Sequence, residues 1–143
     1  MSTKDLKALE RHFFEEWNKG KAAAMAVIDE LCDANLVFHG GVGEEIRGIK
    51  EFKKTMGEMY DAFPDNHMTL DDIIIEGDKA AIRYTVTGTH KGAFMGIPPT
   101  NKKVTSSAIE IDRIVNGKVV EGWAKMDTLG FMQQLGVVPT PKK

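Results

Sequence analysis

The stretch KVVEGWAKMDTLGFMQQLG, residues 118–136, begins with the alternation of a β-strand and ends with the spacing of an α-helix. Alternate residues from Val119 onward fall on one side of an extended segment, and the residues between them fall on the other. Asp127 then stands at the position of a helix N-cap, and Gly136 stands where the helix ends. The spacing allows two roles for Asp127, because an acid there either caps the helix or places a carboxylate at the mouth of a pocket.

Strand patterns also fill the region before this stretch. Three segments have the composition of long strands: His67–Glu76, Lys79–His90 and Lys103–Val115. Gly77-Asp78 is a two-residue turn between the first two, and Asn116-Gly117 is another before Lys118. Residues 91–102, rich in glycine and proline, join two of the strands. The second half of the chain is therefore predicted to form a curved, largely antiparallel sheet.

The first half of the chain has helical spacing instead. Apolar residues from Leu6 to Trp17 repeat at intervals of three and four. Further helices are predicted at Lys21–Leu31 and Ile49–Phe63, with a short strand at Leu36–His39 between them. Helices first and strands after indicate one α+β domain over residues 1–143. Three helices against one curved sheet would form a cone with a pocket between the layers, and a short helix would end the chain.

Composition limits the possible classes of function. The chain has 143 residues, of which 42% are hydrophobic and 28% charged, and its net charge is −2. These values are typical of one globular domain with its own core. The sequence has no basic track for nucleic acid, no apolar run long enough to span a membrane and no signal-peptide pattern in residues 1–7. We therefore expect a cytoplasmic protein that binds neither nucleic acid nor membrane.

Cysteine and histidine give no sign of a metal site or a disulfide. Cys32 is the only cysteine, so an internal disulfide is impossible. Its place beside Leu31 at a helix end is more typical of a small buried hydrophobic residue than of a catalytic thiol. Cys32 and the four scattered histidines have no metal-ligand spacing, and we expect no metal.

Two histidines are candidates for chemistry. In the segment Ala81–His90, alternation places His90 on the same face as Ile82 and Tyr84, and this face should meet the helices. His39 ends the other short apolar strand. Each histidine alone is more typical of a structural residue, but two of them near one acid favour a shared site.

Glu110 is a further candidate, in a segment from Ala108 to Asp112 where apolar and acidic residues alternate. Either set can face outward. An inward Glu110 would have its pKa raised by burial and would be able to transfer protons. An outward Glu110, the orientation that we slightly favour, would be a solvated or interface charge.

Large apolar side chains are predicted to line the pocket, although the same pattern also describes an ordinary core. They are Phe14, Trp17, Met56, Met59, Tyr60, Tyr84, Phe94, Met95 and Trp123.

A series of short motifs runs through nearly the whole chain. They are Leu36-Val37-Phe38-His39, Arg47-Gly48, Ala62-Phe63-Pro64-Asp65, Gly88–Gly92, Phe94–Thr100, Asn116-Gly117-Lys118, Glu121-Gly122-Trp123 and Gln134-Leu135-Gly136. This series closely resembles the SnoaL-like polyketide cyclases, also called ester cyclases, of the nuclear transport factor 2-like (NTF2-like) superfamily of cone folds.

The resemblance implies an enzyme that closes a ring by intramolecular aldol condensation of a polyketide ester, without metal or organic cofactor. An aspartate near the end of the last strand would act as acid and base on a small, largely apolar carbonyl compound. Asp127 would take that role, with His39 and His90 orienting or polarising the carbonyl.

A different alignment changes the assignment of the acid. Counted without gaps from Gln134-Leu135-Gly136, the cyclase acid position falls on Ala124 rather than Asp127. The two residues project to opposite faces of a regular strand, unless a bulge near Lys125 turns Asp127 inward. If Ala124 is the match, Glu110 or a histidine would have to substitute.

Two other functions fit the same fold. A pocket in a chain with eight methionines can hold a small apolar ligand without any chemistry. An epoxide hydrolase would need an Asp-Arg-Asp set around a water molecule. Arg83, Asp112 and Asp127 supply those residue types, but Arg83 falls on the face opposite Tyr84.

Isoleucines in the strands predict a second copy of the chain. Ile73, Ile75, Ile109 and Ile111 alternate with polar residues that are equally plausible on the inner face. Some of them should reach the outer face and form an apolar patch there. A two-fold contact would bury this patch on both subunits, so we expect a homodimer or a higher symmetric oligomer.

Overall fold

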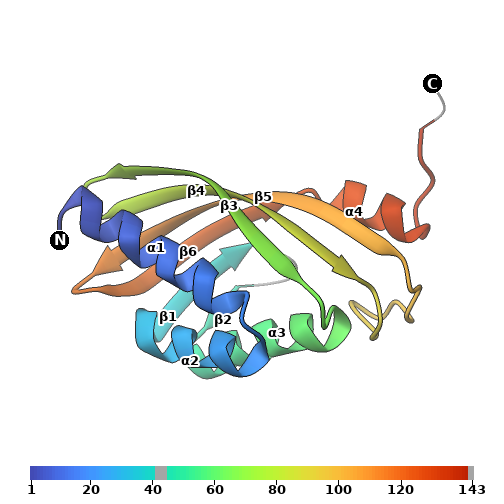
Figure 1. Ribbon diagram of the computed structural model, residues 1–143, viewed down its shortest axis with the longest axis horizontal. Coiled ribbons are helices and arrows are strands. Elements are labelled where there is room, and N and C mark those ends of the chain that lie inside the picture. The colour runs from blue at the N-terminus through green and yellow to red at the C-terminus, as the bar shows by residue number, and fades with distance from the viewer. Residues whose placement is uncertain (41–44, 142–143) are drawn as a thin grey trace.

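Helix α1 (Thr3–Trp17) opens the chain and crosses the concave side of the sheet (Figure 1). Ser2 caps this helix: its hydroxyl accepts a hydrogen bond from the Asp5 amide, and the Asp5 carboxylate accepts one from the Ser2 amide, both at 3.1 Å. The buried face of the helix runs from Leu6 to Trp17, as the apolar spacing predicts.

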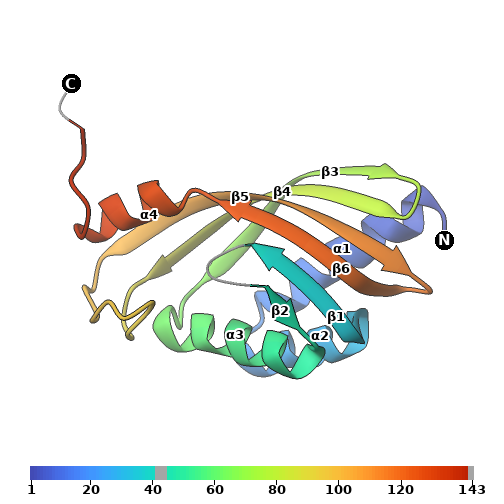
Figure 2. The ribbon, with the colours of Figure 1, turned by 180° about the vertical axis from the view of Figure 1, so that it is seen from behind.

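Two more helices lie on the same side of the sheet (Figure 2). Helix α2 (Lys21–Leu31) leads directly into strand β1 (Cys32–Gly40), and the two-residue strand β2 (Ile46–Arg47) precedes helix α3 (Ile49–Ala62). The computed structural model describes residues 1–40 and 45–141.

The sheet has six strands in the order β2-β1-β6-β5-β4-β3. Its long strands are β3 (His67–Glu76), β4 (Lys79–Thr89), β5 (Lys103–Val115) and β6 (Lys118–Met126). These four form an antiparallel meander, whereas β1 runs parallel to β6, so that the sheet is mixed. The turn between β5 and β6 has positive φ angles at Asn116 (52°) and Gly117 (75°), as a two-residue hairpin of type I′ requires.

A second, smaller core lies at the end of the sheet where helix α4 (Thr128–Leu135) packs. Phe131 and Leu135 of this helix are buried against Ala62 and Phe63. Gly136 ends the helix in the left-handed conformation, with φ 80°.

The predicted α+β cone is confirmed, with small differences in the bounds of its elements. Strand β1 begins at Cys32 rather than at Leu36, because Cys32 pairs with Val119 of β6 and extends the ladder. Helix α3 ends at Ala62, one residue before the predicted end.

Candidate active site

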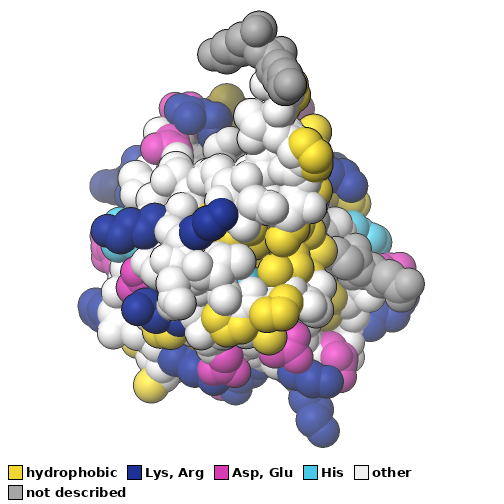
Figure 3. Space-filling model, turned by 90° about the vertical axis from the view of Figure 1, so that its right-hand side faces the viewer, with side chains coloured by type: hydrophobic (Ala, Val, Ile, Leu, Met, Phe, Trp, Pro, Cys, Tyr) yellow, Lys and Arg dark blue, Asp and Glu magenta, His cyan; other side chains and the backbone are white. Residues whose placement is uncertain are grey.

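A cavity of about 410 Å³ lies between the helices and the concave face of the sheet. It opens at the end of the molecule formed by α4 and residues 91–102, where hydrophobic side chains gather (Figure 3). Its walls are almost entirely apolar. The predicted residues Phe14, Trp17, Met56, Met59, Tyr84, Phe94 and Met95 line it, together with Phe38, Phe52, Met68, Ala108, Ala124 and Phe131.

The polar part of this cavity is a cluster of three carboxyl groups and one phenol. Tyr84 of β4 donates a hydrogen bond to Glu110 of β5 at 3.1 Å. Asp112, two residues along the same face of β5, and Glu10 of α1 lie beside it and also line the cavity. Asp112 and Glu10 are 4% and 3% exposed, and Glu110 faces the cavity while it is shielded from bulk solvent. We call these four residues the acid cluster.

Burial raises the pKa of every carboxyl in the acid cluster. It raises the pKa of Glu10 to about 7, against 4.5 for a free side chain. Burial, and then the charge of Asp112, raises the pKa of Glu110 well above its usual value; burial, and then the charge of Glu10, does the same for Asp112. No ion pair within residues 1–40 and 45–141 includes any of the three. The carboxyls of the cluster therefore keep their protons to a higher pH than free side chains do.

Local sequence explains how these acids reach the interior. On β5 the inward residues are Ala108, Glu110 and Asp112, while Ile109 and Ile111 are 59% and 40% exposed. Our slight preference for an outward Glu110 is therefore wrong. The helices lie on the face that carries the acids, and the isoleucines cover the other face.

Two features make room for the inner acids. Glu10 lies in the apolar stripe of α1, four residues after Leu6 and four before Phe14, so the helix carries it inward. Gly122 pairs with Asp112 across the β5–β6 ladder. A Cβ atom at Gly122 would lie 2.9 Å from an Asp112 carboxyl oxygen, so a larger residue would displace that carboxyl.

Glu10 is a site residue that we did not predict; the single acid in its apolar stripe is the signal that would have indicated it.

Asp127 does not line the cavity. It is exposed and caps α4, where its carboxylate accepts a hydrogen bond from the Gly130 amide at 2.9 Å. Ala124, three residues earlier, is buried and lines the cavity directly opposite Glu110 in the ladder. This corrects the expectation that Asp127 lies at the edge of the cavity, since the pairing of β6 with β5 is regular from Glu121 to Met126 and has no bulge near Lys125 that would turn Asp127 inward.

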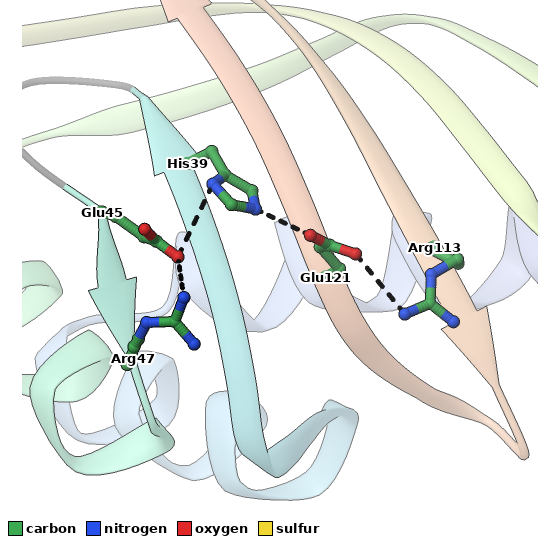
Figure 4. A network of polar contacts seen from close by, with 5 residues as sticks. All are labelled: His39, Glu45, Arg47, Arg113 and Glu121. Carbon is green, nitrogen blue, oxygen red and sulfur yellow. Dashed lines mark hydrogen bonds and ion pairs between the residues drawn. The ribbon is translucent and has the colours of Figure 1, made fainter.

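His39 and Trp123 lie on the outer face of the sheet, not in the cavity. Their rings stack with centroids 5.5 Å apart. His39 contacts Glu121 at 2.7 Å through Nε2, and Glu121 lies 3.5 Å from Arg113 (Figure 4). In β1 it is Phe38 that faces inward, so alternation carries His39 outward.

His90 is fully buried but is not among the residues that line the cavity. Its ring stacks on Phe63 at 5.4 Å, and its Nδ1 accepts a hydrogen bond from the Thr100 amide at 3.3 Å. Within the described residues its Nε2 has no hydrogen-bond partner. His39 and His90 therefore do not share a cavity, contrary to the prediction, and His90 anchors the segment that leads to Thr100.

Two other predicted arrangements also differ from the structure. Tyr60 belongs to the core rather than to the cavity wall, since its ring packs on Trp17 and its hydroxyl donates to the Trp17 carbonyl. Arg83 is exposed and pairs with Asp72 at 2.6 Å, so the Asp-Arg-Asp set of an epoxide hydrolase is not assembled with Asp112 and Asp127.

The part of the chain that the structure describes holds no group of three His, Cys, Asp or Glu side chains placed to bind a metal ion. No helix in the same residues is long and apolar enough to cross a membrane.

Comparison with known proteins assigns the chain to a family. The sequence profile of the SnoaL-like polyketide cyclases matches residues 7–135. The chain belongs to the SnoaL-like polyketide cyclase family. A curated member of similar sequence is the aklanonic acid methyl ester cyclase DauD of Streptomyces sp. (strain C5), 29% identical over 139 residues, which are 94% of this chain and 84% of DauD.

Two solved structures of similar sequence share the fold of this chain, and one of them, AclR, is described as a putative hydroxylase. AclR of Streptomyces galilaeus is 32% identical, with a TM-score of 0.86 over 99% of this chain and 87% of AclR. TsrD of Streptomyces laurentii is 28% identical, with a TM-score of 0.85 over 96% of this chain and 99% of TsrD. The cone fold is therefore shared with these two proteins.

Proposed function

We propose that this SnoaL-like protein closes a ring in a small polyketide-type ester by intramolecular aldol condensation, with Glu110 as the acid and base. One observation carries the proposal: the Glu110 carboxyl lies on the wall of a mostly apolar cavity and accepts a hydrogen bond from Tyr84. Family membership supports the reaction class, and DauD acts, by its name, on a methyl ester of this kind.

The reaction requires one proton to leave a carbon and one to reach an oxygen. Ionised Glu110 removes a proton from the carbon between the ester and a ketone. The resulting enolate carbon attacks a second carbonyl of the same molecule, so a carbon–carbon bond forms and the carbonyl becomes an alkoxide. Glu110 returns its proton to that alkoxide. No electrons leave the substrate, and the groups supplied by the chain suffice.

The cavity supplies the other part of the rate acceleration. Holding the two reacting carbons in contact can contribute about 7–11 kcal/mol to lowering the barrier. Most of the cavity wall beyond the acid cluster is apolar, and exclusion of water strengthens the interaction of the carboxyl with the developing charge.

The geometry also favours one of the two acid assignments. Ala124 faces the cavity and Asp127 does not. The methyl group of Ala124 leaves room directly opposite Glu110, where the reacting part of a substrate would lie. Glu110, on the facing strand, supplies the carboxyl that the alanine lacks.

The inner face of β5 supports an elongated substrate. Ser106 lines the cavity four residues before Glu110, about 13 Å away at the rise of a strand. Its hydroxyl is buried and has no hydrogen-bond partner within the described residues. A largely apolar molecule with one polar group at Ser106 and a carbonyl at Glu110 would satisfy both ends.

Aklanonic acid methyl ester is the probe that tests this function. We expect the purified protein to convert it to a ring-closed isomer of unchanged mass, separable by chromatography. The variant Trp123→Phe leaves Trp17, on the cavity wall, as the sole tryptophan, and its fluorescence should be quenched as the probe binds. The variant Trp17→Phe, which keeps the outer Trp123, is the matched control and should respond little. Quenching of Trp17 fluorescence without any conversion of the ester would contradict the proposed enzymatic activity. It would favour a protein that only binds apolar ligands.

A second copy of the chain is proposed to cover the outer face of the sheet. Strand register places Ile74, Ala81, Ile111, Trp123 and His39 in one row across that face. Ile74 and Ile111 are 68% and 40% exposed, and exposed apolar residues that lie together are typical of a contact between protein chains.

We expect light scattering behind size exclusion, at micromolar concentration, to give twice the 15.8 kDa mass of the chain. The double variant Ile109→Lys, Ile111→Lys should lower this to the mass of one chain, because two buried charges oppose the contact. Leu129→Lys on α4, where the side chain is 60% exposed against 59% for Ile109, is the control and should leave the mass unchanged. A wild-type protein with the mass of one chain would refute the contact.

A further inference from the structure

The cavity offers no cation to the negative charge that the proposed reaction creates. When a proton leaves the carbon between the ester and the ketone, charge appears on a carbonyl oxygen bonded to the neighbouring carbon. A group that stabilises this oxygen must therefore lie close to the base. No Lys, Arg or His side chain lines the cavity among the residues that the structure describes. The stabilising group next to Glu110 has to be an uncharged hydrogen-bond donor.

Tyr84 places such a donor directly beside Glu110. Its hydroxyl donates to Glu110 Oε1 at 3.1 Å, and both side chains line the cavity. Tyr84 pairs with Ala108 across the β4–β5 ladder, and Glu110 is its diagonal neighbour, two residues beyond Ala108. The small side chain of Ala108 leaves room for the phenol to reach Glu110. The ring also packs edge-to-face on Phe14, with centroids 5.3 Å apart, which holds it in place.

The other hydroxyl, amide and indole donors of the wall are either engaged, distant from Glu110 or exposed. The Trp17 indole donates to the Asn66 side chain at 2.7 Å, and the Asn66 amide donates to a backbone carbonyl at 2.9 Å. The Thr55 hydroxyl donates to a carbonyl of its own helix at 3.0 Å. Ser106 lies about 13 Å from Glu110 along β5. The two remaining hydroxyl residues of the wall are exposed: Thr87 and Ser107.

The neighbouring carboxyls are less suitable donors than the phenol. Asp112 and Glu10 also line this end of the cavity, but a carboxyl donates only while it is protonated and repels an enolate once it is ionised. Burial, and then the charge of Glu110, raises the pKa of Tyr84 well above its usual range, so the phenol keeps its hydrogen near neutral pH.

We propose that Tyr84 is a second catalytic residue, whose hydroxyl donates a hydrogen bond to the substrate oxygen that becomes negative as Glu110 removes the proton. The proposal rests on the function proposed for Glu110 and adds the group that stabilises the enolate.

The hydroxyl of Tyr84 changes its partner during the reaction. At rest its single hydrogen is donated to Glu110. Once Glu110 has taken the proton of the substrate carbon, the new O–H of Glu110 donates to the Tyr84 oxygen, and the Tyr84 hydrogen turns to the enolate oxygen. After Glu110 gives its proton to the alkoxide of the closed ring, the Tyr84 hydroxyl donates to the Glu110 carboxylate again. Tyr84 keeps its own proton throughout.

The variant Tyr84→Phe removes the hydroxyl and keeps the ring. We expect the rate constant for ring closure at saturating aklanonic acid methyl ester to fall by about 10²–10³-fold, the usual cost of losing one such donor. Each protein is compared at the pH of its own greatest rate, so that a change in the acidity of Glu110 does not count. Binding, followed by quenching of Trp17, should change little. A Tyr84→Phe protein that reaches the wild-type rate at any pH would overturn the proposal.

Tyr60→Phe is the matched control for this variant. Tyr60 is the only other tyrosine, and its hydroxyl donates to the Trp17 carbonyl in the core. Its replacement should leave the rate constant within about twofold of the wild type. An equal loss in the two variants would show that the effect belongs to packing and would also overturn the proposal.

Binding of 4-nitrophenolate tests the donor without any catalysis. The oxygen of this ligand carries negative charge as an enolate oxygen does, and its visible absorbance reports binding. The measurement uses Glu110→Gln, in which an uncharged amide replaces the protonated carboxyl. Adding Tyr84→Phe to it should weaken phenolate binding about tenfold or more, because a hydrogen bond to a charged group is lost. Nitrobenzene, which lacks the phenol oxygen, should bind both proteins equally. Equal binding of the phenolate would overturn the proposal.

Tyrosine-carbon NMR provides a test in which Tyr84 stays in place. Adding Tyr60→Phe to Glu110→Gln leaves Tyr84 as the sole tyrosine, so a label on the carbon that bears the hydroxyl reports Tyr84 alone. We expect its signal to shift when 4-nitrophenolate binds and to shift little with nitrobenzene. The same small shift with both ligands would overturn the proposal. If the phenolate results are as expected but the wild type converts no ester, the proposed function fails and the donor role of Tyr84 stands.

Discussion

Replacement of Glu110 by glutamine should lower the rate of ring closure by about 10²–10⁴-fold, the usual contribution of a positioned acid or base. Glutamine has nearly the same shape and can still accept the hydrogen bond from Tyr84, but it can neither take nor return a proton. The rate constant at saturating ester is the quantity to measure. Binding, followed by quenching of Trp17, should change little, because the cavity keeps its volume.

Glu121→Gln is the matched control for this variant. Glu121 is also a strand glutamate, on neighbouring β6, but it contacts His39 on the outer face, away from the cavity. Its replacement should leave the rate within about twofold of the wild type. Equal losses in the two variants would show that the effect is not local to the cavity, and a Glu110→Gln protein with full activity would exclude Glu110 as the base.

Replacement of Glu10 by glutamine should remove a large part of the pH dependence of stability. Glu10 titrates near 4.5 in the unfolded chain and near 7 in the fold. Below pH 4.5 the group is neutral in both states. Between these values the unfolded chain releases a proton that the folded chain still holds, so the free energy of unfolding falls as pH rises. The fall for this one group is about 3 kcal/mol, because each pKa unit corresponds to about 1.4 kcal/mol.

Urea unfolding at pH 4.5 and pH 7.5, followed by circular dichroism, measures this difference. The wild type should lose stability between the two pH values, and Glu10→Gln should lose about 3 kcal/mol less. Glu15→Gln, an exposed position on the same helix, should behave as the wild type does. A Glu10→Gln protein with the same loss as the wild type would show that Glu10 does not titrate abnormally.

The sequence was sufficient to predict most of the fold, because local signals decide it. The hairpin turn at Asn116-Gly117 fixes the pairing of the last two strands, and the apolar spacing from Leu6 to Trp17 defines the first helix. Apolar cavity residues such as Trp17 and Met56 were also predictable, since a helix face that meets a curved sheet leaves only one direction for them.

The site itself was only partly predictable from the sequence. Along β5 acidic residues such as Glu110 alternate with apolar residues such as Ile109, and this pattern alone does not determine which of the two sets faces the helices. Burial of two acids on one strand is expensive, and a preference for the apolar set inside follows from that cost alone. The third acid, Glu10, reaches the same point from a segment 100 residues away, and only the tertiary arrangement brings it to Asp112.

His39 and Asp127 were predicted to lie at the cavity, but the structure places both outside it. His39 lies in one of the motifs that resemble the cyclases, Asp127 lies between two of them, and both stand at strand ends, where a shift of one residue changes the face of the sheet. Phe38 and Ala124 take the inward positions instead, so His39 joins the outer network with Glu121 and Asp127 caps α4.

Proton exchange on a substrate that cannot close its ring tests the central claim most directly. The substrate is the methyl ester of a 3-keto acid that has no further carbonyl group for its enolate to attack. It can lose a proton from the carbon between the ester and the ketone, but it cannot close a ring. In deuterated buffer, NMR follows the replacement of that proton by deuterium. We expect the wild type and Glu121→Gln to accelerate the exchange over buffer, and Glu110→Gln to give the rate of buffer alone. Equal acceleration by the wild type and by Glu110→Gln would contradict the assignment of Glu110 as the base.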